Sequence, residues 1–375
     1  MFQGSGDLIM SHKIPISILF TALAAAILVY LLPANPGTTP LAPRTPAPAV
    51  AAAVYRFAVI GDYGSDSADE ARVAALVAGW NPDFVITTGD NNYPDGAAGT
   101  IDRNIGKHYS SFIGNYSGQY GSGSPINRFW PSPGNHDWYS ITCSAAGCNG
   151  PYLDYFTLPG NERYYDVDYG LVHLYALDSY GQEPDGVTTG STQASRLQGE
   201  LADSSACFDV VYFHHPPYSS GKHGSVEEMR WPFADWGADL VLSGHEHSYE
   251  RLDVAGMPYI VNGIGGKSLY DFDHVGDLPA GVTSVVRYND NYGAMLITVT
   301  ATTLTSQLFD YYGVLIDEYV IESDCEDSPT ATATPTVTPT SEISPTVTPA
   351  TTPATAVPTP GIGRSVYLPS IAGNH

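Results

Sequence analysis

The sequence predicts an α/β fold in which layered sheets carry helices on their outer faces. Strand-like apolar segments alternate with helical ones along most of the folded region, whereas its last part contains strand patterns alone. The apolar fraction of 43% is typical of a globular protein, and a length of 375 residues allows one large domain or two smaller ones.

The first β-α-β unit lies near the start of the folded region. Arg56–Ile60 is an apolar run typical of a buried strand, and it ends at Gly61-Asp62. Asp69–Gly79 has the spacing of a helix with one apolar side. Asp83–Thr88 predicts a second strand, which ends at Gly89-Asp90. Both strands are therefore followed by glycine and a carboxylate.

The same alternation returns further along the chain. Thr192–Asp203 predicts a helix that leads to the strand Phe208–Phe213. Ser225–Trp236 predicts another helix, which leads to the strand Asp239–Ser243. Met295–Glu322 alternates as strands without helices, which indicates antiparallel pairing at the end of the domain.

The N-terminus has the pattern of a targeting segment. Lys13 precedes the apolar run Ile14–Leu32. Signal peptides have an apolar core of about 7–15 residues, and a membrane-spanning helix needs about 20. The run fits a cleaved signal peptide or an uncleaved N-terminal anchor, and both stay open.

Composition divides the chain into five segments. Thr-Pro repeats with almost no charge follow the folded region, and such a composition favours an extended stalk over a packed core. The apolar tail beyond the stalk is too short to span a membrane, so it is either a docking signal or a frayed end. We expect a signal peptide or anchor at residues 1–33, a linker at 34–53, a catalytic domain at 54–325, a stalk at 326–361 and a tail at 362–375.

The net charge and the cysteine content limit the cellular location and the kinds of partner to be expected. The formal net charge of −24 argues against binding nucleic acid, which needs a basic surface. Four cysteines in an exported chain are compatible with two disulfides, so we expect a secreted or cell-surface protein. Cys143 and Cys148 are the favoured local pair, and the pairing of Cys207 with Cys325 follows only from the count.

Polar side chains gather just after four of the predicted strands. These residues are Asp62, Asp90, His214 and His245. Ligands of open α/β sheets bind beyond the carboxyl ends of the strands, so we expect these side chains to meet there. Glycine before three of them lets the backbone turn sharply.

Five short motifs contain these residues and add further metal-binding groups. Carboxylate, amide, imidazole and phenol groups suit iron, manganese and zinc, and one carboxylate can bridge two ions. The motifs are Gly61-Asp62-Tyr63-Gly64, Gly89-Asp90-Asn91-Asn92-Tyr93, Gly134-Asn135-His136-Asp137, Val211-Tyr212-Phe213-His214 and Gly244-His245-Glu246-His247.

In kind and order, these motifs resemble the five-motif signature of purple acid phosphatases, within the calcineurin-like metallophosphoesterases. The resemblance covers about Val54 to Glu322. It implies a four-layer α-β-β-α metallophosphoesterase sandwich of two mixed sheets flanked by helices. The domain length is similar to that of the small, mammalian-type branch.

The resemblance also implies a ligand set and two metals. A first site for Fe(III) and a second site for Fe(II), Zn(II) or Mn(II) would share one bridging carboxylate. A phenol that ionises near pH 10 becomes a ligand at lower pH only beside a strongly Lewis-acidic ion, so Tyr93 favours Fe(III). The implied residues are Asp62, Tyr93 and His247 for the first metal, Asn135, His214 and His245 for the second, and Asp90 as the bridge.

The implied activity is hydrolysis of phosphate monoesters by a metal-activated hydroxide. His136 and His223 match positions at which the small purple phosphatases keep histidines near the substrate, so we assign them to phosphate binding and general-acid work. His215 is expected behind the ligands. Two alternatives stay open: a phosphodiesterase or nucleotidase on the same site, and a cell-surface binding module with an inactive site.

Other features have simpler interpretations. His108, His173 and His274 match no motif and are expected to be structural. Asn262–Ser268 resembles a phosphate loop but lacks its first glycine, so we expect it to form a wall of the site. The expected partner is a small phosphate ester, with surface attachment through the N-terminal anchor or the tail; the oligomeric state stays open.

Overall fold

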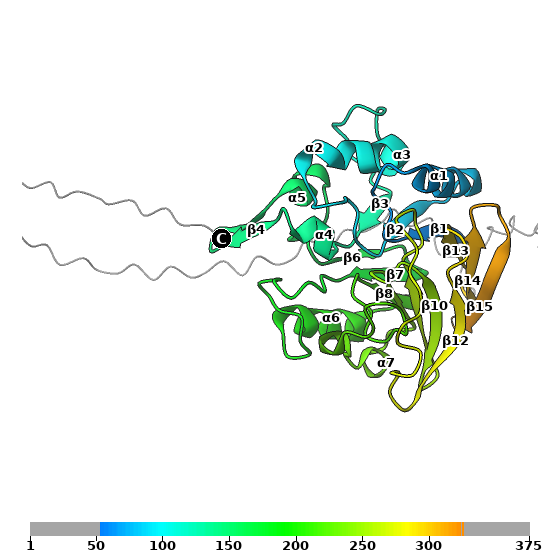
Figure 1. Cartoon of the computed structure of the whole chain (residues 1–375). Coiled ribbons are helices and arrows are strands. Elements are labelled where there is room, and N and C mark those ends of the chain that lie inside the picture. The colour runs from blue at the N-terminus through cyan, green and yellow to red at the C-terminus, as the bar shows by residue number, and fades with distance from the viewer. Residues whose placement is uncertain (1–52, 324, 326–375) are drawn as a thin grey trace, which may run out of the picture. The chain divides into compact units, whose positions relative to one another are not determined.

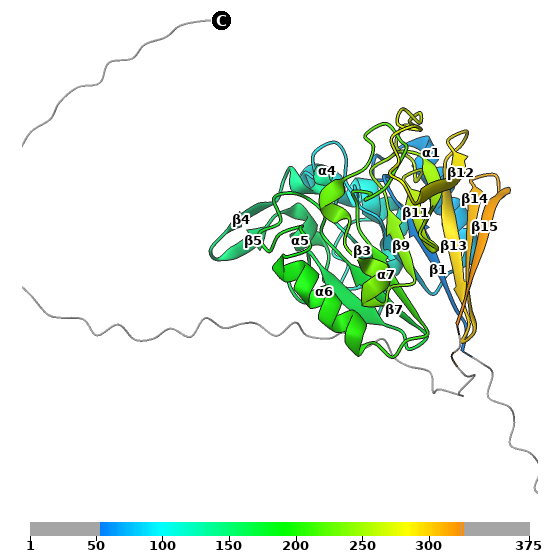
Figure 2. The same cartoon turned by 90° about the horizontal axis from the view of Figure 1, so that it is seen from below.

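The computed structural model describes residues 53–323 and residue 325, and it contains two large sheets (Figures 1 and 2). The first has six strands in the order β15-β14-β13-β1-β2-β3. Its β1, β2 and β3 are parallel to one another, while β13, β14 and β15 are antiparallel. The strands are β1 (Tyr55–Ile60), β2 (Phe84–Thr87), β3 (Phe129–Pro131), β13 (Gly293–Val299), β14 (Thr303–Asp310) and β15 (Leu315–Glu322).

The second sheet has seven strands in the order β12-β10-β11-β9-β8-β7-β6. Its centre is parallel, and β6, β10 and β12 add antiparallel strands toward its two edges. The strands are β6 (Tyr165–Asp168), β7 (Val172–Ala176), β8 (Phe208–Tyr212), β9 (Leu240–Ser243), β10 (Tyr249–Val254), β11 (Met257–Asn262) and β12 (Val282–Tyr288).

Helices cover both outer sides of the paired sheets. Figure 1 shows α1, α2 and α3 on one side and α6 and α7 on the other. The predicted four-layer α-β-β-α sandwich of two mixed sheets is therefore confirmed. The helices are α1 (Ala68–Trp80), α2 (Ala98–Ile101), α3 (Lys107–Tyr109), α4 (Asn135–Trp138), α5 (Pro151–Tyr155), α6 (Thr192–Asp203) and α7 (Phe233–Trp236).

The two long helices begin at serine caps. Ser67 accepts a hydrogen bond from the Glu70 N–H at the start of α1, and Ser191 accepts one from the Ala194 N–H at the start of α6. Such caps satisfy amides that have no partner within the helix. The predicted helix at Ser225–Trp236 is wrong, because Pro232 interrupts it and leaves one short 3₁₀ turn and the four-residue α7.

The parallel strands are buried on both faces. Every residue of β2, β8 and β9 is buried, which explains their nearly continuous apolar runs. In the first sheet Ile60 pairs with Thr87, and in the second Tyr212 pairs with Leu242. Neighbouring parallel strands therefore end at the same level, and the residues that follow them emerge at one edge.

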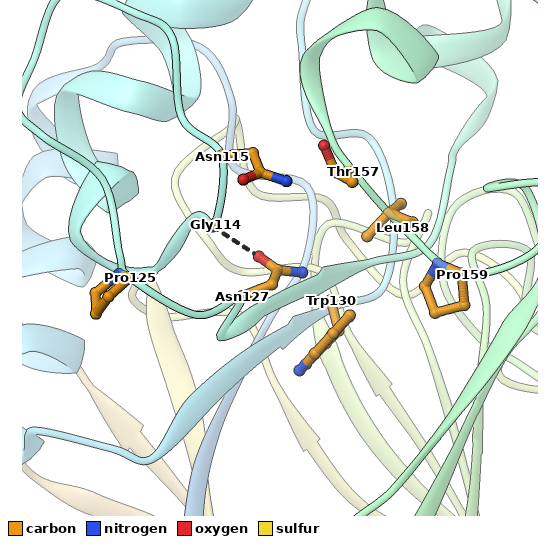
Figure 3. A pocket seen from close by; sticks show the side chains of 8 residues that line it. All are labelled: Gly114, Asn115, Pro125, Asn127, Trp130, Thr157, Leu158 and Pro159. Carbon is orange, nitrogen blue, oxygen red and sulfur yellow. Dashed lines mark hydrogen bonds between the residues drawn. The ribbon is translucent and has the colours of Figure 1, made fainter. Parts of the chain in front are cut away.

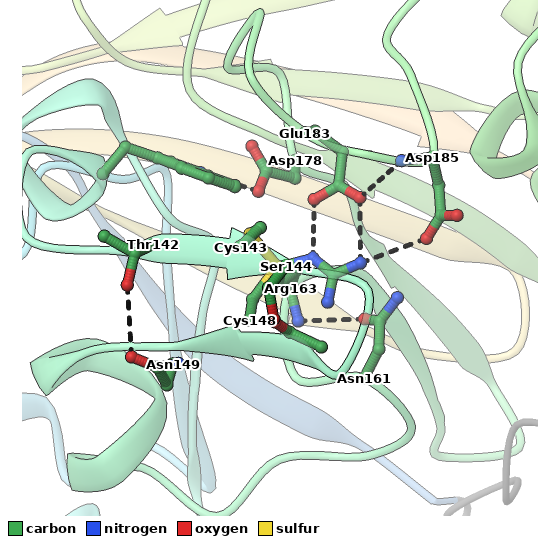
Figure 4. The surroundings of a disulfide bond; sticks show 12 residues. Thr142, Cys143, Ser144, Cys148, Asn149, Asn161, Arg163, Asp178, Glu183 and Asp185 are labelled. Atoms are coloured by element: carbon green, nitrogen blue, oxygen red, sulfur yellow. Dashed lines mark hydrogen bonds and ion pairs between the residues drawn. A yellow bond between two sulfur atoms is a disulfide. The ribbon is translucent and has the colours of Figure 1, made fainter. Parts of the chain in front are cut away.

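The favoured disulfide Cys143–Cys148 is present, and the remaining two cysteines, whose pairing the sequence left open, form a second one. Cys143–Cys148 closes the small hairpin formed by β4 (Thr142–Ser144) and β5 (Gly147–Asn149), beside the buried ion pair of Arg163 with Glu183 (Figure 4). Cys207–Cys325 joins the start of β8 to the chain after β15. Two disulfides are typical of proteins from oxidising, extracytoplasmic compartments.

The predicted N-terminal segment, stalk and tail lie outside the described residues, as does almost all of the linker. Within the described part of the chain, no helix has both the length and the apolar character needed to cross a membrane.

An ion pair joins the two sheets. Arg251 on β10 donates two hydrogen bonds to Asp317 on β15, at 2.7 and 3.0 Å, and Tyr249 donates a third at 2.8 Å. Burial raises the pKa of Asp317, but the bonds from Arg251 and Tyr249 outweigh it and hold the pKa below its ordinary value of 3.8. The stabilisation is therefore present above about pH 4 and is lost as pH falls through the folded-state pKa.

We expect Asp317→Asn to lower the free energy of unfolding at pH 7 by about 1.5–3 kcal/mol, because hydrogen bonds to a charged group are lost. The difference from the wild type should shrink at pH 3, where the wild-type carboxylate is also being protonated. Thermal unfolding followed by circular dichroism at both pH values measures this. A difference in melting temperature that is equal at the two pH values would contradict the assignment.

Candidate metal centre

The residues that follow the parallel strands meet at one edge shared by both sheets. Asp62 and Asp90 come from the first sheet, and His214 and His245 come from the second. Asp62, Asp90 and His245 have φ angles of 53°, 52° and 69°, a left-handed conformation that is uncommon outside glycine. Such strain is frequent at functional sites, and here it turns each side chain inward from the end of its strand.

Gly89 shows why this edge needs glycine. Its φ is +95°, and a Cβ atom placed there would lie 2.6 Å from Nδ1 of His214. The backbone before Asp90 therefore packs directly against the imidazole from the other sheet. Glycine both permits the turn and allows the two sheets to approach.

The first group of metal-binding atoms is buried. The Tyr93 hydroxyl lies 3.2 Å from Oδ1 of Asp62, 2.9 Å from Oδ2 of Asp90 and 3.0 Å from Nε2 of His247. All four side chains are at most 4% exposed. Two carboxylates, a phenol and an imidazole thus converge on one small volume.

The second group is more open. Nε2 of His214 lies 3.1 Å from Oδ1 of Asn135 and 3.2 Å from Nδ1 of His245. It also lies 3.4 Å from Oδ2 of Asp90, the oxygen that contacts Tyr93 in the first group. Asp90 therefore lies between the groups, and the structure brings all seven sequence-predicted ligands together.

Backbone carbonyls orient two of the imidazoles. Nδ1 of His214 lies 2.8 Å from the carbonyl oxygen of Thr88, and Nδ1 of His247 lies 2.6 Å from that of Ser268. An Nδ1–H donor at each carbonyl leaves Nε2 free to bind a cation, as is usual for histidine ligands. Ser268 ends the segment Asn262–Ser268, which forms a wall of the site as predicted.

Backbone amides hold the two carboxylates. The N–H of His245 donates to Oδ2 of Asp62 at 2.9 Å, and the N–H of His136 donates to Oδ1 of Asp90 at 2.8 Å. Each carboxylate keeps its other oxygen directed at the Tyr93 hydroxyl. The ligand atoms are thus oriented by the backbone of neighbouring motifs.

The electrostatics of the site favour a bound cation. Burial and then the charges of Asp90 and Asp62 raise the pKa of Tyr93 well above 10, so the phenol ionises at ordinary pH only if a cation displaces its proton. Burial raises the pKa of Asp90, but His214 and His136 outweigh it and keep the pKa below its ordinary value. A buried carboxylate held in its ionised form is a suitable metal ligand.

The pKa values of the two imidazoles in the second group shift in opposite directions. Burial lowers the pKa of His214, but Asp90 outweighs it and raises the pKa to about 9. Burial and the neighbouring His214 lower the pKa of His245 well below 6.5, which keeps that imidazole neutral. The donor set fits two cations: four donors lie around one position, three around the other, and Asp90 lies between them.

The two histidines assigned to general-acid work lie at the rim. The His136 ring packs on the Tyr93 ring at 4.3 Å, and its Nδ1 contacts the carbonyl oxygen of Pro94. The exposed His223 ring lies 4.6 Å from the ring of His245. Burial and then His247 lower the pKa of His223. Both imidazoles therefore face the centre, His136 from α4 and His223 from a loop.

His215 lies closer to the centre than its expected place behind the ligands suggests. Its ring is 4.5 Å from that of His245, and its Nδ1 is 2.9 Å from Oγ of Ser179. Burial and then His214 lower its pKa to about 3, so it is a neutral imidazole. It forms a compact group with His214 and His245.

Sequence reasoning missed the role of Asp137. Its Oδ2 accepts hydrogen bonds from the Gly134 N–H at 2.8 Å and from the backbone and side chain of Asn91 at 3.1 and 2.9 Å. It therefore joins the start of α4, which carries Asn135 and His136, to the loop that carries Asp90. A carboxylate three residues after the glycine that starts α4 is a helix-cap pattern, which was the available sequence signal.

The remaining histidines lie elsewhere. His108 contacts Asp66, His173 lies 2.9 Å from Asp166, and His274 lies 2.7 Å from Asp277. Among the described residues, none of the three belongs to either histidine and carboxylate group.

A cavity of about 280 Å³ shares no residue with the centre (Figure 3). Two of its polar side chains are already engaged: Asn127 accepts a hydrogen bond from the Gly114 N–H, and Trp130 donates one to Tyr169. No titratable side chain lines it. The chemistry of the described residues is therefore concentrated at the strand ends.

The contact at Gly89 gives a direct test of the centre. We expect Gly89→Ala to displace His214 and to weaken Zn²⁺ binding to the metal-free protein by about 10–100-fold, the cost typical of disturbing a ligand's support. Gly99→Ala is the matched control, because no atom lies within 4 Å of its added Cβ. Isothermal titration calorimetry measures both. Unchanged Zn²⁺ affinity in Gly89→Ala would contradict this role of His214.

Comparisons with known proteins agree with this geometry. Purple acid phosphatase 17 of Arabidopsis thaliana is 24% identical over 297 residues, which cover 70% of this chain and 83% of that protein. Purple acid phosphatase 4 of the same plant is 24% identical over 338 residues, covering 81% and 94%. The chain is thus distantly related to plant purple acid phosphatases, and these relatives do not single out the small, mammalian-type branch.

Two solved structures share the fold. Purple acid phosphatase PPD1 from yellow lupin (Lupinus luteus) seeds has a TM-score of 0.57 at 19% identity, covering 76% of this chain and 57% of that one. GAP50, the anchor in the inner membrane complex of Plasmodium, has a TM-score of 0.53 at 16% identity, covering 73% and 89%. The sequence profile of calcineurin-like phosphoesterases matches residues 55–249, just over half of the chain. The chain therefore belongs to the calcineurin-like phosphoesterase family.

Proposed function

We propose that this protein hydrolyses phosphate monoesters at a binuclear metal centre of the purple acid phosphatase type, with Fe(III) and a divalent ion, Fe, Zn or Mn. One observation carries the proposal: seven oxygen and nitrogen donors converge in two adjoining groups, and Asp90 reaches both. Such an arrangement suits two ions that share a carboxylate.

When bound, the two ions supply the Lewis acidity that activates water and neutralises charge on the phosphoryl group. The chain's own residues do the rest. The backbone amides that hold Asp62 and Asp90 keep the donors fixed, and the burial of the first group excludes bulk water. The partial exposure of Asn135 and His245 leaves the second group as the side from which a phosphate ester enters.

The proton balance assigns roles to the rim histidines. A water oxygen bonds to phosphorus, the bond from phosphorus to the leaving oxygen breaks, and that oxygen needs a proton. We assign this donation to the exposed imidazole of His223, and we assign phosphate binding to His136, which packs beside Tyr93. The products are inorganic phosphate and an alcohol.

Two rival functions use the same fold. A phosphodiesterase or nucleotidase would need the same ligands, because metal ligands do not select the leaving group. A binding module is the second rival, and the likeness to GAP50, an anchor by its description, gives it a specific observation. The complete set of seven donors favours the enzyme, since a module without catalysis has no need of strained and buried ligands.

The proposal extends to location and organisation. We propose export, with residues 54–325 as the catalytic domain between an N-terminal targeting segment and a C-terminal stalk. The two disulfides and the relationship to purple acid phosphatases support this. Assignment to the small branch rests on the domain length alone.

Metal content and substrate choice test the function. We expect two metal ions in each purified chain and hydrolysis of para-nitrophenyl phosphate but not of bis-para-nitrophenyl phosphate. Asp90→Asn should lower kcat by more than about 100-fold, because disturbing only the support of a ligand costs about 10–100-fold. Asp209→Asn is the control, since Asp209 is a buried carboxylate at the opposite end of β8. Plasma emission spectrometry that finds no metal in any preparation would refute the enzyme.

Tyr93 tests the nature of the first metal. We expect a visible charge-transfer absorption from a phenolate bound to Fe(III), and we expect Tyr93→Phe to lose it while the second metal is retained. Visible spectra together with metal analysis of the two proteins measure this. A colourless, fully active wild type with two zinc ions would refute the iron assignment and leave the phosphoesterase proposal in place.

A further inference from the structure

Glu246 is a buried carboxylate with no part in the proposed chemistry. It lies between His245 and His247 in the chain and is 0% exposed. Its Oε1 accepts a hydrogen bond of 2.7 Å from the backbone N–H of His223. Burial raises its pKa to about 7, while the backbone amides of His223, Lys222 and Gly224 favour its ionised form. The side chain is thus hydrogen-bonded to the backbone of the loop that carries His223.

The loop of residues 219–224 rests directly on this carboxylate. A Cβ atom on Gly221 would lie 2.5 Å from Oε2 of Glu246. That oxygen is buried and has no hydrogen-bond partner in the described part of the chain. A buried carboxylate with a free oxygen is costly, so its retention here calls for a role.

Glu250 holds the other end of the same loop. Its Oε2 accepts a hydrogen bond of 2.7 Å from the Ser220 N–H, and its Oε1 lies 3.2 Å from Nε of Arg287. Glu250 is 0% exposed and lies on β10, four residues after Glu246. Two buried carboxylates therefore hold the loop by hydrogen bonds to its backbone. Glu246 is the one that accepts the hydrogen bond from the His223 N–H.

Packing alone does not fix the outer side of the loop. A polar cavity of about 230 Å³ lies there, lined by His223, Ser225, Arg230, His274 and other residues. On this side the loop accepts one backbone hydrogen bond, from the His274 N–H to the Ser220 carbonyl. Without Glu246, His223 could move outward into this space.

We propose that Glu246 is a positioning residue, which holds the His223 loop so that the imidazole stays at the leaving-group side of the centre. The inference rests on the proposed function, in which His223 donates the proton to the leaving oxygen as its bond to phosphorus breaks. Glu246 itself touches neither substrate nor metal. Its contribution is to keep His223 against His245, where the rings are 4.6 Å apart.

Leaving-group dependence distinguishes this role from general support of the fold. An alkoxide leaving group needs a proton in the transition state, whereas 2,4-dinitrophenolate leaves without one. Loss of a positioned general acid therefore slows hydrolysis of ethyl phosphate and spares 2,4-dinitrophenyl phosphate. Loss of metal ligands, or of folded protein, slows both reactions equally.

The experiment compares Glu246→Met, which has a similar length and no acceptor, with Glu246→Gln, which keeps one acceptor oxygen for the His223 N–H. In Glu246→Met we expect kcat for ethyl phosphate to fall by about 100-fold and kcat for 2,4-dinitrophenyl phosphate to change by less than about 3-fold, as for loss of a general acid. His223→Asn should show the same pattern, and Glu246→Gln should retain most of the activity. Equal losses on both substrates in Glu246→Met would overturn the proposal.

Glu200→Met is the matched control. Glu200 is a partly buried glutamate on α6 whose Oε2 also lacks a partner and whose pKa burial also raises to about 7. It pairs with Arg196 on the outer helix layer and does not contact the loop. We expect unchanged rate ratios for the two substrates. If Glu246→Met does not fold, Gly221→Ala disturbs the same contact from the loop side and should give the same leaving-group pattern.

Hydrogen exchange gives a readout that is independent of catalysis. In metal-free Glu246→Met we expect amide exchange in residues 219–224 to become at least about 10-fold faster than in the wild type, because the hydrogen bond from the His223 N–H to the side chain of residue 246 is lost. Glu246→Gln should stay close to the wild type. Unchanged exchange in Glu246→Met would overturn the positioning role even in an active enzyme. A different outcome separates the two proposals. If the wild type cleaves neither ester while exchange in Glu246→Met is faster as expected, the proposed function is overturned and, with it, the assignment of a general acid to this loop.

Discussion

The fold depends on bringing two carboxylates, Asp62 and Asp90, out of water at the shared edge of two sheets. An unpaired buried carboxylate is costly, and its neighbours here are a phenol and imidazoles. Backbone amides offset part of that cost. The rest of the offset needs positive charge, which His214 supplies in part and which the proposed metal ions would complete.

The register of the strands makes this concentration of charge achievable. Parallel neighbours end level with one another, so short loops deliver ligands from four strands to one volume. Left-handed backbone at Asp62, Asp90 and His245 costs on the order of 1–3 kcal/mol each. Strand burial on both faces supplies the rigidity that holds these conformations. The stability of the sheets therefore offsets the free-energy cost of the strained backbone at the site.

Much of the fold and the site was predictable from the sequence, for physical reasons. Strands buried on both faces read as apolar runs, and Gly-Asp or Gly-His after them marks where ligands emerge, so β1, β2, β8 and β9 were found. The half-buried strand β12 and the small hairpin β4–β5 lack such runs and were missed. The helix expected at Ser225–Trp236 failed because periodicity outweighed Pro232 in the prediction.

The supporting residues were harder to predict than the ligands. The partner of Glu246 is the backbone of His223, and amide groups carry no residue-specific pattern in a sequence. The position of Asp137 in a helix-cap pattern was a weak signal in the sequence. Its second partner, Asn91, lies 46 residues earlier, so no local pattern indicated that contact. Ligands follow from side-chain chemistry, whereas the geometry that aims them is set by contacts that only folding creates.

The disulfide between Cys207 and Cys325 has a mechanical consequence. β15 is an edge strand, and a pull on the chain at residue 325 would otherwise peel it from β14 one hydrogen bond at a time. The covalent link instead passes the load to the start of β8, in the interior of the second sheet. There β8 is hydrogen-bonded to β7 on one side and to β9 on the other. Tension applied at residue 325 therefore reaches an interior strand directly and does not have to pass through the pairing of β14 with β15.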